Sequence, residues 1–272
     1  MNAVNKTLFI PLYGKAYVSR RGLFLEDKKA EEIWNKEGFP LKGKSRSKWL
    51  AFYMGIRAAV FDEWLRSQMT LHPDAVILHI GCGLDSRILR VGSEHRKWYD
   101  IDFPEVIAER KRFFPPLPGY EMVAGDARDP VFLNTIPKGV PAIVVMEGIC
   151  MYLTSEELKS ITAAISTHFS HVSLLMDCYT ALAAKISKIK NPVKDVGVTQ
   201  VYGMDDPRIL DREAFVFLQE HPMTPQTYID ELEGTERAIF QRLYAGSMSK
   251  KLYRLFEYTS NQSPLHSKKN LL

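Results

Sequence analysis

Cysteine is scarce in this chain of 272 residues, which has only three: Cys82, Cys150 and Cys178. None of them forms a CxxC pair, so the sequence indicates neither a disulfide framework nor a cysteine zinc site, and we predict no metal site. Isolated thiols in apolar segments are typical of a reducing compartment, and we expect the protein to be cytoplasmic.

Long hydrophobic runs are also missing. No apolar stretch reaches the roughly 18 residues that a membrane span needs, and residues 1–11 lack the apolar region of a signal peptide. The net charge is only +4, too small to indicate nucleic-acid binding. Basic residues cluster once, at residues 42–48 (KGKSRSK). This cluster is either a solvated loop or a patch that attracts an anionic substrate. We expect no membrane or nucleic-acid partner.

The composition that remains is that of an ordinary globular protein, with 46% hydrophobic and 25% charged residues. We predict one domain with a helical cap (1–70), a cofactor-binding core (75–178), a lid insertion (179–211), C-terminal strands with a helix (212–259) and a polar tail (260–272). The aliphatic residues of the insertion fit either an apolar substrate or ordinary packing: Leu182, Ile186, Ile189 and Val193.

From residue 75 onward, short apolar runs alternate with helical stretches. Such a pattern predicts an α/β fold with a largely parallel sheet covered on both faces. The expected strands are residues 75–80, 97–101, 121–124, 142–146, 172–176, 215–219 and 252–259. The expected helices are residues 28–36, 49–69, 86–91, 104–114, 155–169, 180–189 and 224–245.

Chemically active residue types follow the first four of these strands. The first ends in Gly81 and Gly83, which would let a ligand approach the backbone or simply form a turn. Asp102 ends the second strand, roughly 20 residues later, where nucleotide-binding folds place an acid on the ribose. It competes with Asp100 for that role and could instead cap a helix.

The third and fourth strands also end in acids. Asp126 lies where an adenine amino group would be met, although turns use aspartate too. Glu147 follows five apolar residues, so we expect it to be partly buried and to need a cationic partner such as a ligand.

Three acids beside a glycine turn disfavour a pyrophosphate and favour S-adenosyl-L-methionine, which carries a ribose diol, a sulfonium and an ammonium group. Its carboxylate calls for an arginine, and Arg57 and Arg87 are the candidates. A nicotinamide-dependent oxidoreductase is the alternative, but Ser86 stands where its fingerprint wants a third glycine.

Across nearly the whole chain, the sequence resembles the leucine carboxyl methyltransferase superfamily, and within it the bacterial polyketide-type (tetracenomycin-type) O-methyltransferases. The segments that carry the resemblance are residues 7–16, 57–62, 80–87 (IGCGLDSR), 99–106 (YDIDFPEV), 125–129 (GDARD), 147–153 (EGICMYL) and 202–208. The resemblance implies a class I methyltransferase fold, a Rossmann-like seven-stranded sheet with its last strand antiparallel.

The resemblance also implies a role for each cofactor-binding residue. Arg57 would hold the methionine carboxylate, Gly81, Cys82 and Gly83 would pack against the cofactor, and Asp102 would bind the ribose. The remaining roles are Asp126 and Ala127 at the adenine, Glu147 at the methionyl group, and Lys15 in a segment folded over the cofactor. Cys82, Ala127 and Lys15 depart from the commonest family residues without removing a needed charge.

The acceptor is expected to be a carboxylate, or a hydroxyl, of a small polyketide-like molecule. A carboxylate is ionised at neutral pH and needs no general base, and no certain catalytic residue stands out. Tyr152 could contact the substrate, while His79, His168 and His171 are expected to be structural. A protein C-terminus as the acceptor, and a binding protein without turnover, remain as alternatives.

Overall fold

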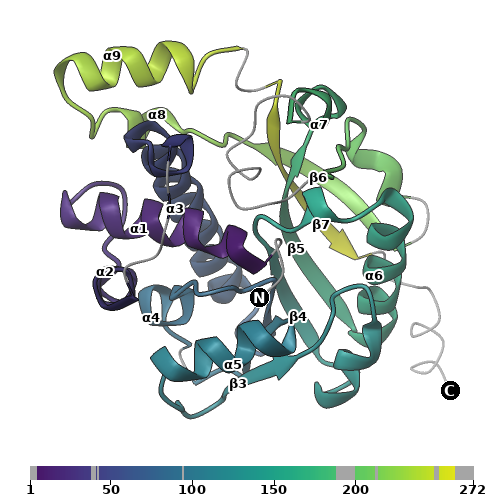
Figure 1. Cartoon of the computed structure of the whole chain (residues 1–272). Helices are drawn as coiled ribbons and strands as arrows, with labels where there is room; N and C mark the ends of the chain where they lie inside the picture. Colours follow the sequence, from purple (N-terminus) through teal and green to yellow (C-terminus); the bar gives the residue numbers. More distant parts are fainter. Residues whose placement is uncertain are drawn as a thin grey trace, which may run out of the picture.

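Seven strands form one mixed sheet in the order β3-β2-β1-β4-β5-β7-β6 (Figure 1). The computed structural model describes residues 5–37, 41, 43–93, 95–187, 200–211, 214–247 and 251–260. The strands are β1 (Val76–Ile80), β2 (Trp98–Asp102), β3 (Tyr120–Ala124), β4 (Pro141–Met146), β5 (His171–Tyr179), β6 (Phe215–His221) and β7 (Tyr253–Ser260). β1 to β5 pair in parallel, and β7 runs antiparallel to both β5 and β6. This confirms the predicted fold.

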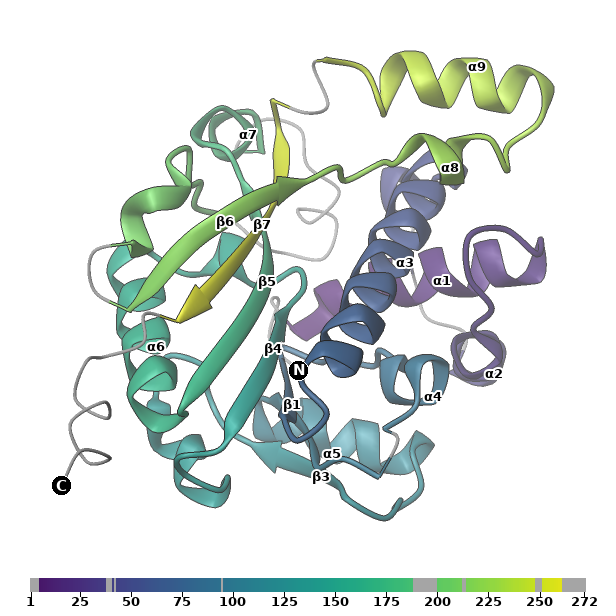
Figure 2. The ribbon, with the colours of Figure 1, turned by 180° about the vertical axis from the view of Figure 1, so that it is seen from behind.

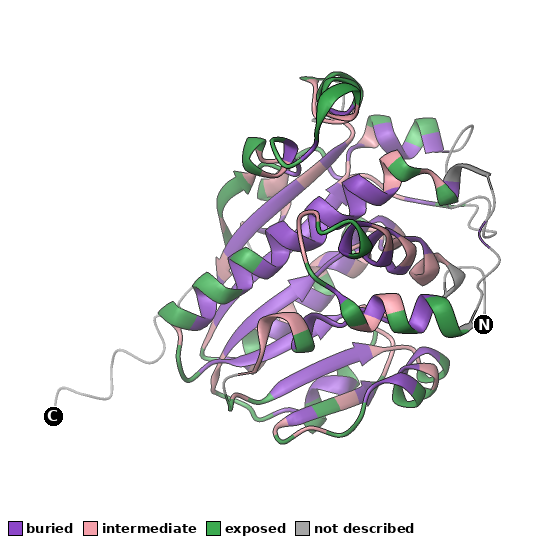
Figure 3. Cartoon of the chain, turned by 90° about the vertical axis from the view of Figure 1, so that its left-hand side faces the viewer, coloured by how far each residue is buried: buried purple, intermediate pink, exposed green. Residues whose placement is uncertain are grey.

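The strands divide their side chains between two cores. Along β4, Ile143 and Val145 pack into the core shared with α3, whereas Val144 and Met146 pack into the core shared with α6. Successive side chains of a strand point to opposite faces, so a nearly continuous apolar run serves both cores at once. The five inner strands are accordingly buried along most of their length, whereas the edge strands β3 and β6 are partly exposed (Figure 3).

The helices alternate with the strands as the sequence predicted. They are α1 (Phe9–Arg20), α2 (Lys28–Glu37), α3 (Lys48–Leu71), α4 (Arg87–Val91), α5 (Pro104–Phe113), α6 (Ser155–His168), α7 (Ala181–Ser187), α8 (Gln226–Ile229) and α9 (Gly234–Leu243), with short 3-10 turns that include η1 (Asn5–Leu8), η3 (Pro130–Thr135) and η4 (Cys150–Tyr152). Local signals fix several starts. Thr154 and Glu157 form a capping box at α6, and Pro104 occupies the first turn of α5.

A helical cap covers one side of the sheet and is built from both ends of the sequence. α1 and α3 pack together, and α8 and α9, inserted between β6 and β7, lie over them (Figure 2). Trp49 of α3 stacks on Tyr244 with ring centroids 6.0 Å apart. The prediction of one helix over residues 224–245 is wrong, because α8 ends at Ile229 and a turn over residues 230–233 separates it from α9. The second helix begins at Gly234, whose φ of +49° lies in the left-handed region.

The described residues cover part of the predicted lid insertion. Leu182 and Ile186 are exposed on α7, whereas Ile189 and Val193 lie outside the described residues. Within the basic stretch at 42–48, Lys48 pairs with Glu236 at 2.9 Å, and Lys42 is outside the described part. The tail beyond residue 260 is also outside it. No helix in the described part of the chain has both the length and the apolarity to cross a membrane.

Candidate active site

A cavity of 390 Å³ opens at the carboxyl ends of β1, β2, β3 and β4, beneath the N-terminal part of the cap. Ligand sites of α/β proteins lie at this edge of the sheet, and the volume falls within the 300–1,000 Å³ that is typical of small-molecule sites. The predicted site residues that line it are Lys15, Arg57, Gly81, Cys82, Gly83, Asp102, Asp126, Ala127, Glu147 and Tyr152. Arg87 is the one predicted site residue outside this lining.

The turn after β1 depends on its glycines. Gly81 and Gly83 have φ values of +73° and +52°, which side chains rarely adopt. A Cβ atom on Gly81 would lie 2.0 Å from Cγ2 of Ile149, so the loop after β4 packs directly against this turn. The glycines are therefore required by the fold as well as by any ligand that approaches the backbone.

Asp102, at the end of β2, is the acid of the site that has no cationic partner among the described residues. Its carboxylate accepts the backbone N–H groups of Gly83 and Phe103, each at 2.8 Å. Burial raises the pKa of Asp102 to about 6 against the effect of these two hydrogen bonds. Asp100, its competitor, lies outside the cavity lining and is paired with Arg110 and with the hydroxyl of Tyr120.

Asp126 follows β3, the strand next to β2, and the backbone N–H of Gly125 just before it donates to the carbonyl of Asp102 at 2.9 Å. Asp126 accepts the backbone N–H of Arg128 at 2.9 Å and pairs with the guanidinium of the same residue. These contacts with Arg128 lower the pKa of Asp126. The residue is partly exposed, which leaves its carboxylate accessible to a ligand at the edge of the cavity.

Glu147 is buried and has cationic partners, as the sequence predicted. The expectation gave a ligand as an example of such a partner, and the protein itself already supplies two. Oε1 lies 3.0 Å from the Arg57 guanidinium, and Oε2 accepts a hydrogen bond from Arg87. Burial alone would raise the pKa of Glu147, but the two arginines outweigh it and lower the pKa to about 2.

Arg57 of α3 lines the cavity with one hydrogen-bond donor to spare. NH1 donates to Asp177 at 3.1 Å and to the Tyr253 hydroxyl at 2.8 Å, and NH2 faces Glu147. Its buried Nε has no hydrogen-bond partner among the described residues. A buried donor without a partner is costly, so this nitrogen is an unsatisfied group of the site.

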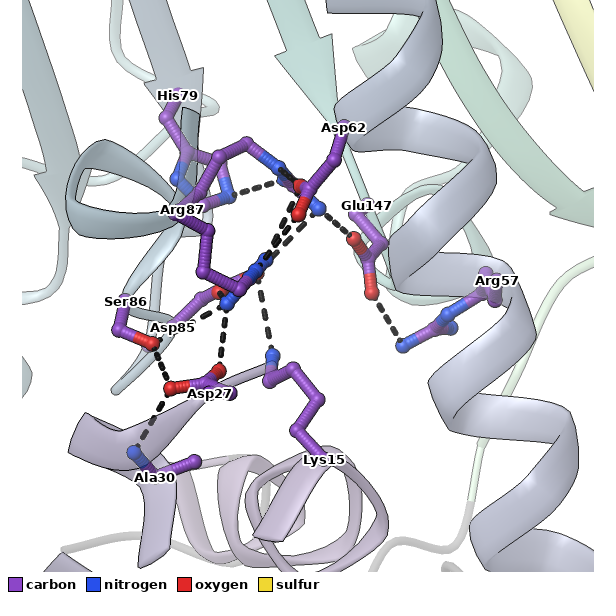
Figure 4. A network of polar contacts seen from close by, with 12 residues as sticks. Lys15, Asp27, Ala30, Arg57, Asp62, His79, Asp85, Ser86, Arg87 and Glu147 are labelled. Carbon is purple, nitrogen blue, oxygen red and sulfur yellow. Dashed lines mark hydrogen bonds and ion pairs between the residues drawn. The ribbon is translucent and has the colours of Figure 1, made fainter. Parts of the chain in front are cut away.

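Arg87 lies behind the cavity, fully buried in a network of charges (Figure 4). It donates from Nε to Asp62 at 2.8 Å and from NH2 to Glu147. Lys15, by contrast, lines the cavity and pairs with Asp85 at 3.1 Å. This salt bridge ties α1 to the loop that follows the glycine turn.

One tyrosine and one of the three histidines considered in the sequence analysis line the cavity. Tyr152 lines the cavity from η4. His79 also lines it, with Nε2 3.1 Å from Arg87 and Nδ1 3.4 Å from Asp100, and burial lowers its pKa. His168 and His171 lie outside the lining, the first against the carbonyl of Ile136 and the second beside His72.

Sequence reasoning missed the residues that hold the site in place. Asp177, at the end of β5, accepts the backbone N–H of Gly148 at 2.6 Å and the Tyr253 hydroxyl at 2.5 Å. Asp62 and Asp85 join the network around Arg87 in the same way. A signal was available for Asp177, because an acid that follows a continuous apolar run is buried and needs partners.

Comparison with known proteins indicates one family. The family model described as leucine carboxyl methyltransferase matches residues 3–166. The tetracenomycin polyketide synthesis O-methyltransferase TcmP of Streptomyces glaucescens is 26% identical over 263 residues, which are 95% of this chain and 97% of that protein. The S-adenosyl-L-methionine-dependent methyltransferase dpfgK of Gibberella zeae is 29% identical over 183 residues, 62% of this chain and 61% of its own length.

Solved structures share the fold. A magnesium protoporphyrin IX methyltransferase of Synechocystis PCC 6803 superposes with a TM-score of 0.50 at 12% identity, covering 86% of this chain and 100% of that one. A methyltransferase of Listeria monocytogenes superposes with a TM-score of 0.51 at 12% identity, covering 75% and 99%. The match of the family model to more than half of the sequence is decisive: the chain belongs to the leucine carboxyl methyltransferase family.

Proposed function

We propose that this chain is an O-methyltransferase that takes its methyl group from S-adenosyl-L-methionine and transfers it to a carboxylate of a small organic molecule. One observation carries the proposal. A single cavity brings together Asp102, an acid without a cationic partner, and Arg57, a guanidinium with an unused donor, next to Glu147.

These residues fit the cofactor group by group. The carboxylate of Asp102 can accept two donors, as a ribose diol requires. Asp126 and Ala127 would meet the adenine, and Arg57 would hold the methionine carboxylate. Glu147 would accept the ammonium group, and Lys15 would close the cavity from α1. Bound there, the cofactor would supply an electrophilic methyl group on a positively charged sulfur.

The chain's own part in the reaction is to bind, orient and exclude water. A carboxylate acceptor is already ionised near neutral pH, so the step needs no general base. His79 lines the cavity, but its Nε2 faces the Arg87 guanidinium and not an acceptor. This arrangement favours an acceptor that needs no general base. Tyr152 could contact the acceptor through its hydroxyl.

A small molecule is favoured over a protein C-terminus as the acceptor. The cavity is closed by Leu8, Leu12 and Met54 of the N-terminal cap, which gives it an apolar wall. A relative that matches almost the full length of the chain is named for polyketide synthesis. Both observations favour an apolar organic acid.

The test is product formation. The purified protein is incubated with methyl-labelled S-adenosyl-L-methionine and a panel of aromatic and aliphatic acids, matched phenols, and a peptide ending in leucine. We expect base-labile methyl esters from acids in the panel. Transfer only to phenols or only to the peptide would contradict the proposed acceptor. Binding of the cofactor without transfer to any acceptor would favour a binding protein. In a parallel incubation with an oxidised nicotinamide cofactor in place of S-adenosyl-L-methionine, reduction of the nicotinamide would favour an oxidoreductase.

A further inference from the structure

The geometry points to Arg87 as a positioning residue that fixes the carboxylate of Glu147 and does not itself contact the cofactor. The inference rests on the proposed function, in which Glu147 receives the cofactor's ammonium group. It reassigns Arg87, which the sequence suggested as a direct partner of the methionine carboxylate.

Burial and bonding exclude Arg87 from direct contact. Its exposed fraction is 0%, and it is absent from the cavity lining. Each nitrogen of the guanidinium has a partner: Nε donates to Asp62, Nη1 faces Nε2 of His79, and Nη2 donates to Glu147. A guanidinium held on three sides in this way cannot swing toward a ligand without leaving buried partners unsatisfied.

Glu147 is clamped between two guanidinium groups. Arg87 holds Oε2 from behind, and Arg57 holds Oε1 at 3.0 Å from the side of α3. One bond to each oxygen fixes the plane of the carboxylate. A carboxylate offers about four acceptor sites, so roughly two remain for a ligand's ammonium group.

A second layer of charge keeps Arg87 in place (Figure 4). Asp62 of α3 accepts Nε of Arg87 at 2.8 Å and also Nε of Arg90 at 2.6 Å. Arg90 in turn reaches Asp27, in the connection between α1 and α2, at 2.6 Å. The network therefore anchors Arg87 to the helical cap, and Asp62 supports Glu147 without touching it.

The experiment compares two ligands on the full-length protein. S-adenosyl-L-methionine carries the methionyl ammonium and carboxylate, whereas 5′-methylthioadenosine has the adenosine and sulfur without them. Dissociation constants for both are measured by calorimetry for the wild type, Arg87→Lys, Asp62→Asn and Glu147→Gln. Glu257→Gln is the matched control, because Glu257 is also a buried acid with several partners but lies outside the cavity lining.

We expect Arg87→Lys to weaken binding of S-adenosyl-L-methionine by about tenfold and that of 5′-methylthioadenosine by less than about twofold. Asp62→Asn should show the same selectivity with a smaller loss, and Glu257→Gln should change neither constant. Equal losses for both ligands would reduce Arg87 to a general structural role and overturn the inference. Unchanged binding of both would overturn it as well.

A double variant separates positioning from direct contact. If Arg87 acts through Glu147, then Arg87→Lys combined with Glu147→Gln should bind S-adenosyl-L-methionine no more weakly than Glu147→Gln alone. Fully additive losses would show that Arg87 acts on the cofactor independently. A wild-type protein that binds neither ligand would instead refute the proposed function.

Discussion

Asp102 accepts the backbone N–H of Gly83 at 2.8 Å, so the carboxylate that ends β2 holds the glycine turn that follows β1. Two neighbouring strand ends are thereby joined at the floor of the cavity. The same carboxylate is partly buried and forms no salt bridge among the described residues, which makes it the acid best able to accept hydroxyl groups from a ligand.

Asp102→Asn should weaken binding of S-adenosyl-L-methionine by about 1–3 kcal/mol, because an amide oxygen replaces a charged acceptor. The measurement is isothermal titration calorimetry at pH 8. Asp74→Asn is the control, since Asp74 is an exposed acid outside the cavity lining. Equal affinities for Asp102→Asn and the wild type would remove Asp102 from the site.

Cofactor affinity should fall in mild acid. Burial raises the pKa of Asp102 to about 6, and the ionised form is the one that accepts two hydroxyl groups. One pH unit below this pKa, at about pH 5, binding should therefore be about tenfold weaker than at pH 8. Asp102→Asn should remove this part of the pH dependence; an identical slope in the variant would assign it to another group.

The same carboxyl has the opposite effect on the fold. Its folded pKa of about 6 lies above the ordinary value of 3.8. Protonated Asp102 therefore contributes stability that is fully present below about pH 4 and is lost as the pH rises through about 6. Protonation of Asp102 therefore does not unfold the protein, so it cannot weaken cofactor binding by that route. Thermal melts at pH 5 and pH 8, compared between the wild type and Asp102→Asn, check this.

Arg57→Met should destabilise the protein by about 3–5 kcal/mol, because it leaves Glu147 and Asp177 buried with one cation fewer. Arg57→Lys should retain more stability and still bind the cofactor poorly, since a lysine cannot present the same fork of donors. Arg254→Met, which breaks the more exposed pair with Glu220, should cost at most about 1 kcal/mol in urea unfolding. Equal losses for Arg57→Met and Arg254→Met would contradict the buried network.

Gly81→Ala should destabilise the fold more than Gly22→Ala. Both glycines have left-handed φ values, +73° and +64°, so both substitutions carry a backbone strain of about 1–2 kcal/mol. Only at Gly81 does the new Cβ meet another residue, 2.0 Å from Ile149, whereas nothing lies within 4 Å at Gly22. Urea unfolding of the two variants isolates this overlap, and equal losses would show that the loop after β4 moves aside freely.

The sequence predicted the sheet well because its strands are buried on both faces. Continuous apolar runs such as residues 142–146 are typical of such strands, and the polar residues directly after them lie at one edge of the sheet. Asp102, Asp126 and Glu147 therefore came together as expected. The helix expected over residues 224–245 is instead two helices, because a turn over residues 230–233 leads into Gly234, which begins α9 with a left-handed φ.

The charge pairing within the site could not be predicted in the same way. Arg57 and Glu147 come from a helix and a strand end that are distant in sequence, and their contact depends on how α3 packs on the sheet. Hydrophobic periodicity shows which face of a helix is buried but not which buried acid each arginine meets. For that reason the sequence predicted that Glu147 needs a cationic partner but did not identify Arg57 and Arg87 as the ones that neutralise it.

The most direct test of this account is a crystal structure of the protein with S-adenosyl-L-homocysteine. We predict that the ligand occupies the cavity at the ends of β1 to β4, with its ribose on Asp102, its adenine beside Asp126 and its amino-acid end against the Arg57–Glu147 pair. A ligand bound in another cavity, or in this one with its two ends exchanged, would contradict it.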